Sequence, residues 1–101
     1  MNHLDNIDNL IKNIVSILTS NLDTSKIYLF GSRAKNKNDS NADFDFAIEA
    51  LEPELSLLRY IRGEIDKIAG LYKVDLVFLE NCDEDFKKII KESGKVVYER
   101  T

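Results

Sequence analysis

Apolar residues recur along the first half of the chain in two different periods, which predict one helix and two strands. Residues 4–20 repeat apolar side chains every three or four positions, as an amphipathic helix does. Residues 27–30 form a short apolar run that is typical of a strand buried on both faces. Residues 43–48 alternate polar and apolar side chains with a period of two, which predicts a second strand.

The second half of the chain predicts one longer helix, one shorter helix and two more strands. The longer helix is expected over residues 53–69, because Pro53 suits a first turn and Gly70 is placed to end it. Strands are expected at residues 74–79 and 95–98, with a short helix over residues 83–91 between them. The apolar stripe expected on the longer helix consists of Leu55, Leu58, Ile61, Ile65 and Ile68.

The order of these elements predicts the fold class. Helix, strand, strand, helix, strand, helix and strand together indicate an α/β (α+β) domain, a small mixed sheet of about four strands flanked by helices. The connection between the first two strands is too short for a crossover helix, so that pair is expected to be antiparallel. We expect a single domain over residues 1–101.

Composition narrows the class of protein further. The chain has 14 basic and 18 acidic side chains and a net charge of -4, which argues against bulk binding to nucleic acid. No apolar run approaches the length of a membrane helix, and the first residues lack the pattern of a signal peptide. Cys82 is the single cysteine, which fits a reducing compartment, so we expect a cytoplasmic protein.

Two aspartates interrupt the apolar pattern of the second strand and suggest a metal site. Asp43 and Asp45 are two residues apart, so their carboxylates share one face and repel each other unless a cation lies between them. Magnesium prefers such oxygen ligands together with substrate phosphates. Asp75 lies within the third strand and would complete the cluster if that strand lies beside the second.

A Gly-Ser pair precedes this strand and has the chemistry of a phosphate site. Gly31 lets backbone N–H groups approach a ligand closely, and Ser32 at a helix start would offer its hydroxyl to an anion. The basic side chains of Arg33, Lys35 and Lys37 follow within reach of a polyphosphate.

Each of these signals alone has a simpler interpretation. Most Asp-x-Asp pairs are solvated, and a solvent-facing sheet surface explains Asp43 and Asp45 without a metal. That interpretation does not explain Asp75 inside an apolar strand. Glu49 follows the same strand and either supports the site from outside or, as we favour, is solvated.

Taken together, the motifs resemble a known signature. Gly31-Ser32, ten intervening residues and then Asp43-Phe44-Asp45 resemble the Gly-Ser-x10-Asp-x-Asp signature of the polymerase-beta-like nucleotidyltransferase superfamily. The stretches "LFGSRA", "ADFDFAI" and "YKVDLVFLE" are also similar to its small members. The resemblance implies a polymerase-beta-like fold and magnesium-dependent transfer of a nucleoside monophosphate from a nucleoside triphosphate, with release of pyrophosphate.

The same resemblance implies roles for individual residues. Asp43 and Asp45 would bind two magnesium ions, while Asp75 would bind the catalytic one and help deprotonate the acceptor hydroxyl. The residues implied to hold the triphosphate are Gly31, Ser32 and Arg33.

Among family members, the chain looks like the minimal nucleotidyltransferases, or MNT proteins, because no acceptor-binding domain is visible. The resemblance implies a HEPN-type toxin as partner in a hetero-oligomer, in a type VII-like toxin-antitoxin pair. The chain would then be a protein adenylyltransferase that moves AMP from ATP to a tyrosine of the toxin. Two alternatives stay open: neutralisation by binding alone, and nucleotidyl transfer to a small molecule or an RNA end.

Overall fold

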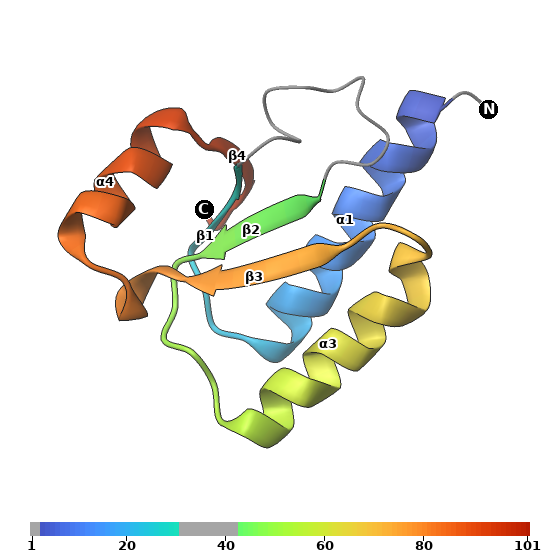
Figure 1. The fold of residues 1–101 in the computed structure, drawn as a ribbon, viewed down its shortest axis with the longest axis horizontal. Helices are drawn as coiled ribbons and strands as arrows, with labels where there is room; N and C mark the ends of the chain where they lie inside the picture. The colour runs from blue at the N-terminus through green and yellow to red at the C-terminus, as the bar shows by residue number, and fades with distance from the viewer. Residues whose placement is uncertain (1–2, 31–42) are drawn as a thin grey trace.

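The fold is a mixed sheet with helices on both faces (Figure 1). It is taken from a computed structural model, which describes residues 3–30 and 43–101. Within these residues the strands form one four-stranded sheet of order β3-β2-β1-β4. The elements are α1 (His3–Asn21), β1 (Lys26–Phe30), β2 (Phe44–Ile48), α3 (Leu55–Ala69), β3 (Val74–Phe78), the 3-10 helix η1 (Leu79–Asn81), α4 (Glu84–Ser93) and β4 (Lys95–Glu99).

The pairing of the strands confirms the expected mixed sheet. β1 runs antiparallel to β2 and to β4, whereas β2 and β3 are parallel. The antiparallel β1–β2 pair was predicted from the short connection between these strands. The parallel β2–β3 pair follows from α3, which returns the chain to the same end of the sheet before β3 begins.

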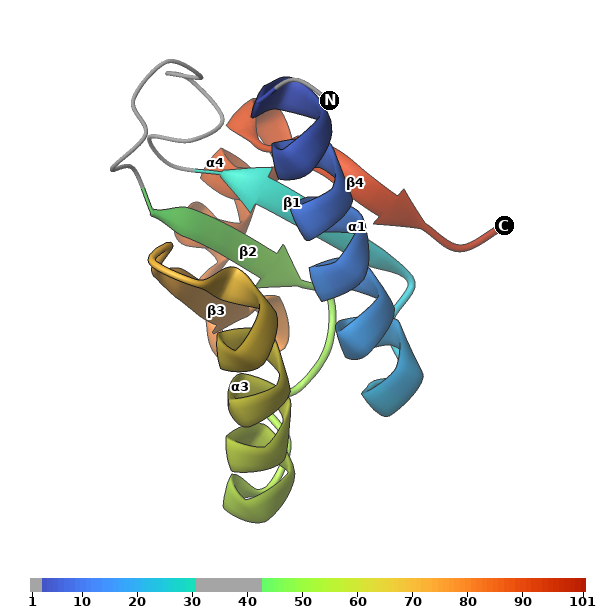
Figure 2. The same ribbon diagram turned by 90° about the vertical axis from the view of Figure 1, so that its right-hand side faces the viewer.

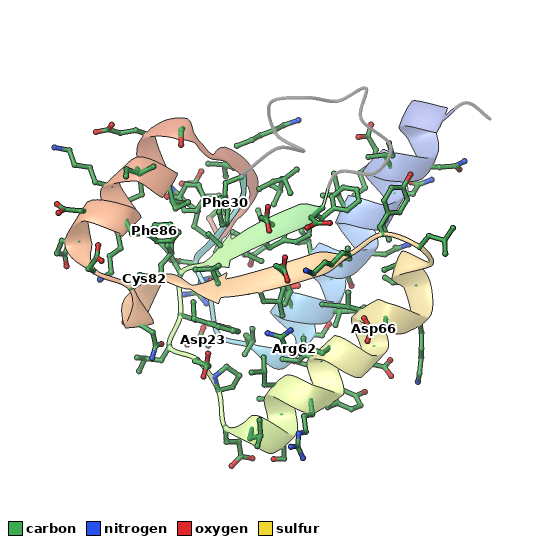
Figure 3. The ribbon with its side chains drawn as sticks, in the orientation of Figure 1. Asp23, Phe30, Arg62, Asp66, Cys82 and Phe86 are labelled. Atoms are coloured by element: carbon green, nitrogen blue, oxygen red, sulfur yellow. The ribbon has the colours of Figure 1, made fainter. Side chains whose placement is uncertain are left out.

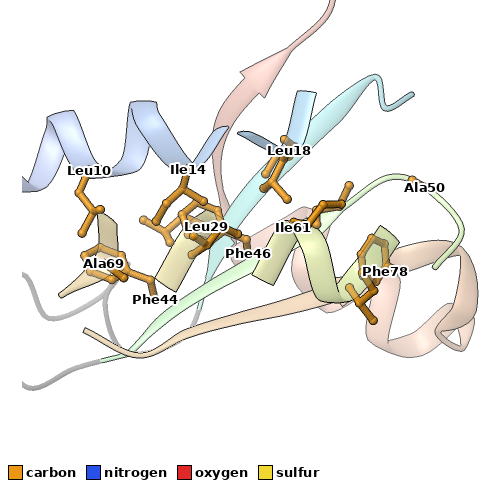
Figure 4. Close-up of a cluster of buried hydrophobic side chains, with 14 residues drawn as sticks. Leu10, Ile14, Leu18, Leu29, Phe44, Phe46, Ala50, Ile61, Ala69 and Phe78 are labelled. Carbon is orange, nitrogen blue, oxygen red and sulfur yellow. The ribbon is translucent and has the colours of Figure 1, made fainter. Parts of the chain in front are cut away.

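The sheet separates two layers of helices. Figure 2 shows α1 and α3 in front of the sheet and α4 behind it. The face toward α1 and α3 carries the main core, to which β2 contributes Phe44, Phe46 and Ile48 (Figure 4). The residues of β2 between them therefore point to the α4 face, because side chains alternate along a strand.

A second, smaller apolar cluster holds α4 against its face of the sheet. Its buried members are Tyr28 of β1, Ala47 of β2, Leu79 and Ile90, and Phe86 packs at its border. The side chain of Asp83 begins α4 by accepting a hydrogen bond of 2.8 Å from the backbone N–H of Phe86. α4 thus covers one part of this face.

The long helix differs from its prediction at both ends of its apolar stripe. α3 begins at Leu55 rather than at Pro53, which precedes the capping residue Glu54. Leu55 and Ile68 are 60% and 39% exposed, so they do not belong to the buried stripe. Successive residues of a helix are rotated by about 100° around its axis. A row of residues spaced by three or four positions therefore drifts around the axis, and its end members leave the buried face. The buried residues of α3 are Leu58, Ile61, Ile65 and Ala69.

Other predicted boundaries hold within one or two residues. Gly70 ends α3 with a positive φ of 64°, as glycine readily does. Leu79, predicted as the end of the third strand, instead begins η1. The helical turn predicted at 32–35 and the loop predicted at 36–41 lie outside the described residues. None of the helices in the described part of the chain combines the length and apolar character needed to span a membrane.

Candidate active site

The register of β2 and β3 brings the acidic residues of the two strands together. Asp45 and Asp75 are direct Cα partners in the parallel ladder, one position after the pair formed by Phe44 and Val74. Asp43 immediately precedes β2 and is two residues from Asp45. The condition under which Asp75 would join the cluster, that the third strand lies beside the second, is therefore met. We call Asp43, Asp45 and Asp75 the acid row.

The acid row lies on the α4 face of the sheet, beyond the area that α4 covers. Asp45 shares its side of β2 with Ala47, which is buried in the cluster beneath α4. On the neighbouring strand β1, Phe30 is the register partner of Asp45. The ring of Phe30 meets that of Phe86 edge to face, with centroids 6.2 Å apart (Figure 3). This aromatic pair packs against the apolar cluster beneath α4.

The three carboxylates are half-buried and influence one another electrostatically. Burial raises the pKa of Asp45, and the negative charges of Asp75 and Asp43 raise it further. Hydrogen bonding to Asp75 acts in the same direction. The acid row therefore concentrates negative charge, and none of the ion pairs formed within the described residues includes one of its carboxylates.

One cation lies near the acid row without pairing with it. The positive charge of Lys73 acts on Asp45 and partly offsets the rise of its pKa. Within the described residues, none of the ion pairs shorter than 4 Å includes Lys73. The sequence prediction missed Lys73, although its place two residues before Asp75 was a signal that both side chains share a face.

The donor set suits a hard divalent cation. Carboxylate oxygens are the ligands that magnesium prefers, and usually only one or two come from protein while substrate phosphates and water supply the others. No three His, Cys, Asp or Glu side chains within residues 3–30 and 43–101 stand close enough to enclose an ion by themselves. The paired Asp45 and Asp75 thus match a site that substrate phosphates complete, rather than a closed protein cage.

Other candidate residues fall outside this arrangement or outside the described residues. The three residues predicted to hold the triphosphate, Gly31, Ser32 and Arg33, lie outside the described residues. Glu49 lies past the opposite end of β2, where it accepts a hydrogen bond from Ser25 and pairs with Lys91 at 3.5 Å. Glu49 therefore does not support the acid row. Its half-buried ion pair also differs from the solvated side chain that we favoured.

Fold and acid row together define the class of protein. The mixed sheet has helices on both faces and carries aspartates on two adjacent parallel strands, as expected from the resemblance to nucleotidyltransferases. The chain belongs to the family described as "Polymerase beta, Nucleotidyltransferase", whose sequence profile matches residues 12–101. This match confirms the resemblance and the predicted fold class.

Two curated relatives carry the name of a protein-modifying enzyme. The chain is 34% identical over 84 residues to the protein adenylyltransferase MntA of Aphanizomenon flos-aquae, covering 72% of this chain and 55% of that relative. It is 35% identical over 75 residues to a probable protein adenylyltransferase MntA of Haemophilus influenzae, covering 73% and 66%. In each case the match leaves at least a third of the relative's length uncovered.

Solved structures with the same fold come from toxin-antitoxin complexes. One is a toxin-antitoxin structure with AMP-PNP, at a TM-score of 0.72 and 24% identity, covering 90% of this chain and 74% of the other. Another contains the tri-AMPylated HEPN toxin of Shewanella oneidensis in complex with an MNT antitoxin, at a TM-score of 0.66 and 23% identity, covering 89% and 70%. At these identities the likeness establishes the fold.

Proposed function

We propose that this chain is the catalytic domain of a protein adenylyltransferase that transfers AMP from ATP to a tyrosine hydroxyl of a HEPN-type toxin. It would act in the cytoplasm as the antitoxin of a type VII-like pair and assemble with its partner as a hetero-oligomer. The pairing of Asp45 with Asp75 is the observation that carries this proposal. The names of the two MntA relatives and the AMPylated toxin in a complex of the same fold support the nature of donor and acceptor.

The acid row supports a catalytic role because it is costly without a cation. Like charges directly opposite each other destabilise a sheet, and burial adds to the cost of each ionised carboxylate. A protein that only bound its partner would have no use for this arrangement. The mutual repulsion of Asp45 and Asp75 therefore favours catalysis over neutralisation by binding alone.

The residues present fit magnesium, and each has a proposed task. Asp43 and Asp45 would hold two ions, and Asp75 would hold the catalytic one. Magnesium bound there would neutralise the charge of the triphosphate and lower the pKa of a coordinated hydroxyl. Gly31, Ser32 and Arg33 are proposed to hold the triphosphate through backbone N–H groups, a hydroxyl and a guanidinium.

The proposed transfer needs a group that accepts the proton of the hydroxyl and a site that holds ATP, the AMP donor. The acceptor hydroxyl loses its proton to the carboxylate of Asp75, and its oxygen forms the new bond to the α-phosphorus of ATP. The bond between the α-phosphorus and its bridging oxygen to the β-phosphorus breaks, and the electron pair leaves with pyrophosphate. Positioning by the acid row and the triphosphate site accounts for most of the catalysis expected of such a site.

The test follows the α-phosphate of ATP. Purified chain, magnesium and ATP labelled at the α-phosphate are added to a lysate of the source cell, in parallel with the Asp75→Asn variant. Asp66→Asn is the matched control, because Asp66 is an exposed aspartate of α3 on the other side of the sheet (Figure 3). We expect label on one discrete protein with wild type and with Asp66→Asn, and none with Asp75→Asn.

Other results would redirect the assignment. Label on RNA or on a small molecule would replace the protein acceptor by one of those acceptors. Equal labelling by wild type and Asp75→Asn would show that the acid row is not the catalytic site. An Asp45→Asn variant that still protects cells fully from the toxin would establish neutralisation by binding.

A further inference from the structure

Lys73 occupies a defined place beside the acid row. Its backbone carbonyl accepts a hydrogen bond of 2.9 Å from the N–H of Phe44, which fixes the segment before β3 against the start of β2. The ladder places Phe44 opposite Val74, so Asp43 and Lys73 are neighbours one position before that pair. Lys73 also precedes Asp75 by two residues, so its side chain extends on the same face of the sheet as the acid row.

The ammonium group of Lys73 is exposed and is not engaged by another described side chain. It stands near Asp45 without forming an ion pair shorter than 4 Å, although three carboxylates lie on the same face. A long lysine side chain keeps its rotamer freedom in such a position and pairs readily with an incoming anion. A cation held at this place is therefore available to negative charge that the substrates bring.

The order of the strands indicates which of the two substrates lies nearer to Lys73. The proposed triphosphate site begins with Gly31, directly after β1 in the sequence, whereas Lys73 and Asp75 belong to the β3 side. β2 lies between β1 and β3, so β1 and β3 are about 10 Å apart, or two strand spacings. Lys73 thus shares the side of Asp75, which the proposed mechanism assigns to the acceptor hydroxyl.

We propose that Lys73 is a catalytic residue that stabilises negative charge on the acceptor oxygen as this oxygen attacks the α-phosphorus. The proton of the hydroxyl goes to Asp75, the bond from oxygen to phosphorus forms, and pyrophosphate leaves with the electron pair of the broken bond. The ammonium group of Lys73 takes no part in the proton transfer and contributes its charge alone. This role rests on the proposed function and adds a residue that specifies how the acceptor is activated.

The experiment compares Lys73→Met and Lys73→Arg with wild type in steady-state AMP transfer to the HEPN protein from the same genome. Removing a group that stabilises charge only in the transition state should lower kcat by about 100- to 1000-fold. The KM for ATP and the Kd for magnesium-ATP should stay unchanged, and Lys73→Arg should restore most of kcat. Lys12→Met removes the same charge from an exposed position on α1, across the sheet, and should transfer like wild type.

The outcomes separate this inference from the proposed function. A wild-type chain that binds magnesium-ATP but transfers AMP to no protein would overturn both. An active wild type with an equally active Lys73→Met would overturn the role of Lys73 alone. A Lys73→Met variant that binds ATP more weakly at unchanged kcat would place Lys73 at the triphosphate and also overturn the inference.

Discussion

Asp45 and Asp75 face each other as direct partners across two parallel strands, with no described side chain between them that pairs with either. Neighbouring strands are about 4.8 Å apart, so the two carboxylates repel at close range. In the main core, by contrast, β2 buries Phe44, Phe46 and Ile48 completely. The same strand thus provides stability on one face and a costly charge cluster on the other.

The first prediction concerns the free energy that the repulsion between these carboxylates costs the folded protein. Asp45→Asn removes the charge that Asp75 and Asp43 oppose, so it should raise the free energy of unfolding by up to about 1 kcal/mol at pH 7 without magnesium. Urea denaturation with added EDTA measures this change. Asp66→Asn makes the same substitution at an exposed position on α3 and should stay within about 0.5 kcal/mol of wild type. A destabilised Asp45→Asn variant would mean that the carboxylate forms a favourable contact in the folded protein.

The second prediction is the pH dependence that the same carboxylate causes. Because the pKa of Asp45 is raised in the folded protein, the folded state binds its proton more tightly than the unfolded state does. As pH rises from the ordinary aspartate pKa through the raised one, this contribution to stability is lost. Wild type should therefore lose more stability than Asp45→Asn over that window, measured without magnesium. Parallel pH profiles of the two proteins would contradict the shift.

The order of the helices and strands was predictable because the apolar residues of each recur with a clear period. Alternation in residues 43–48 reflects two faces in different environments, and the period alone assigned the phenylalanines to one face and the aspartates to the other. Exposure along α3 was less predictable. Leu55 and Ile68 match a helical spacing but lie outside the arc that the sheet and α1 cover, which depends on where the helix docks.

The residues of the acid row could be named from the sequence, but their arrangement in space depended on an unknown strand pairing. The sequence pairs Asp43 with Asp45 by spacing, but Asp75 joins them only if β3 lies beside β2. That pairing is a tertiary fact, fixed by the return of the chain through α3. Lys73 was missed because its one signal in the sequence, a place two residues before Asp75, does not distinguish it from other exposed lysines. Its importance appears only with the register that sets it beside the acid row.

The third prediction concerns ligand binding. Magnesium and ATP together should raise the melting temperature of wild type, since a ligand at 100 times its Kd stabilises the folded state by about 2.7 kcal/mol. Asp45→Asn should show a much smaller increase, because one of the proposed magnesium ligands is lost. Differential scanning fluorimetry with EDTA as the reference state measures both. An equal increase in the two proteins would show that nucleotide binds without the acid row.

The fourth prediction compares two glycines, one with close neighbours around it and one with open space. At Gly94, between α4 and β4, an added Cβ would lie 2.7 Å from the carbonyl oxygen of Ile90 and 3.3 Å from Cβ of Tyr28. Gly94→Ala should therefore cost about 1 to 3 kcal/mol, since the backbone of α4 must shift. Gly63 in α3 has no heavy atom within 4 Å of an added Cβ. Gly63→Ala should stabilise the protein by about 0.5 to 1 kcal/mol through helix propensity.

Urea denaturation of both alanine variants tests this contrast, with wild type as the reference. The comparison is informative because each variant adds one methyl group, so a difference in sign reflects the local packing and the helix propensity at each position. Gly94 also fixes how α4 approaches Tyr28, in the cluster that lies next to Phe30 and the acid row. Gly94→Ala should consequently lower AMP transfer more than Gly63→Ala does. Equal stability of the two variants would show that the connection after α4 adapts without strain.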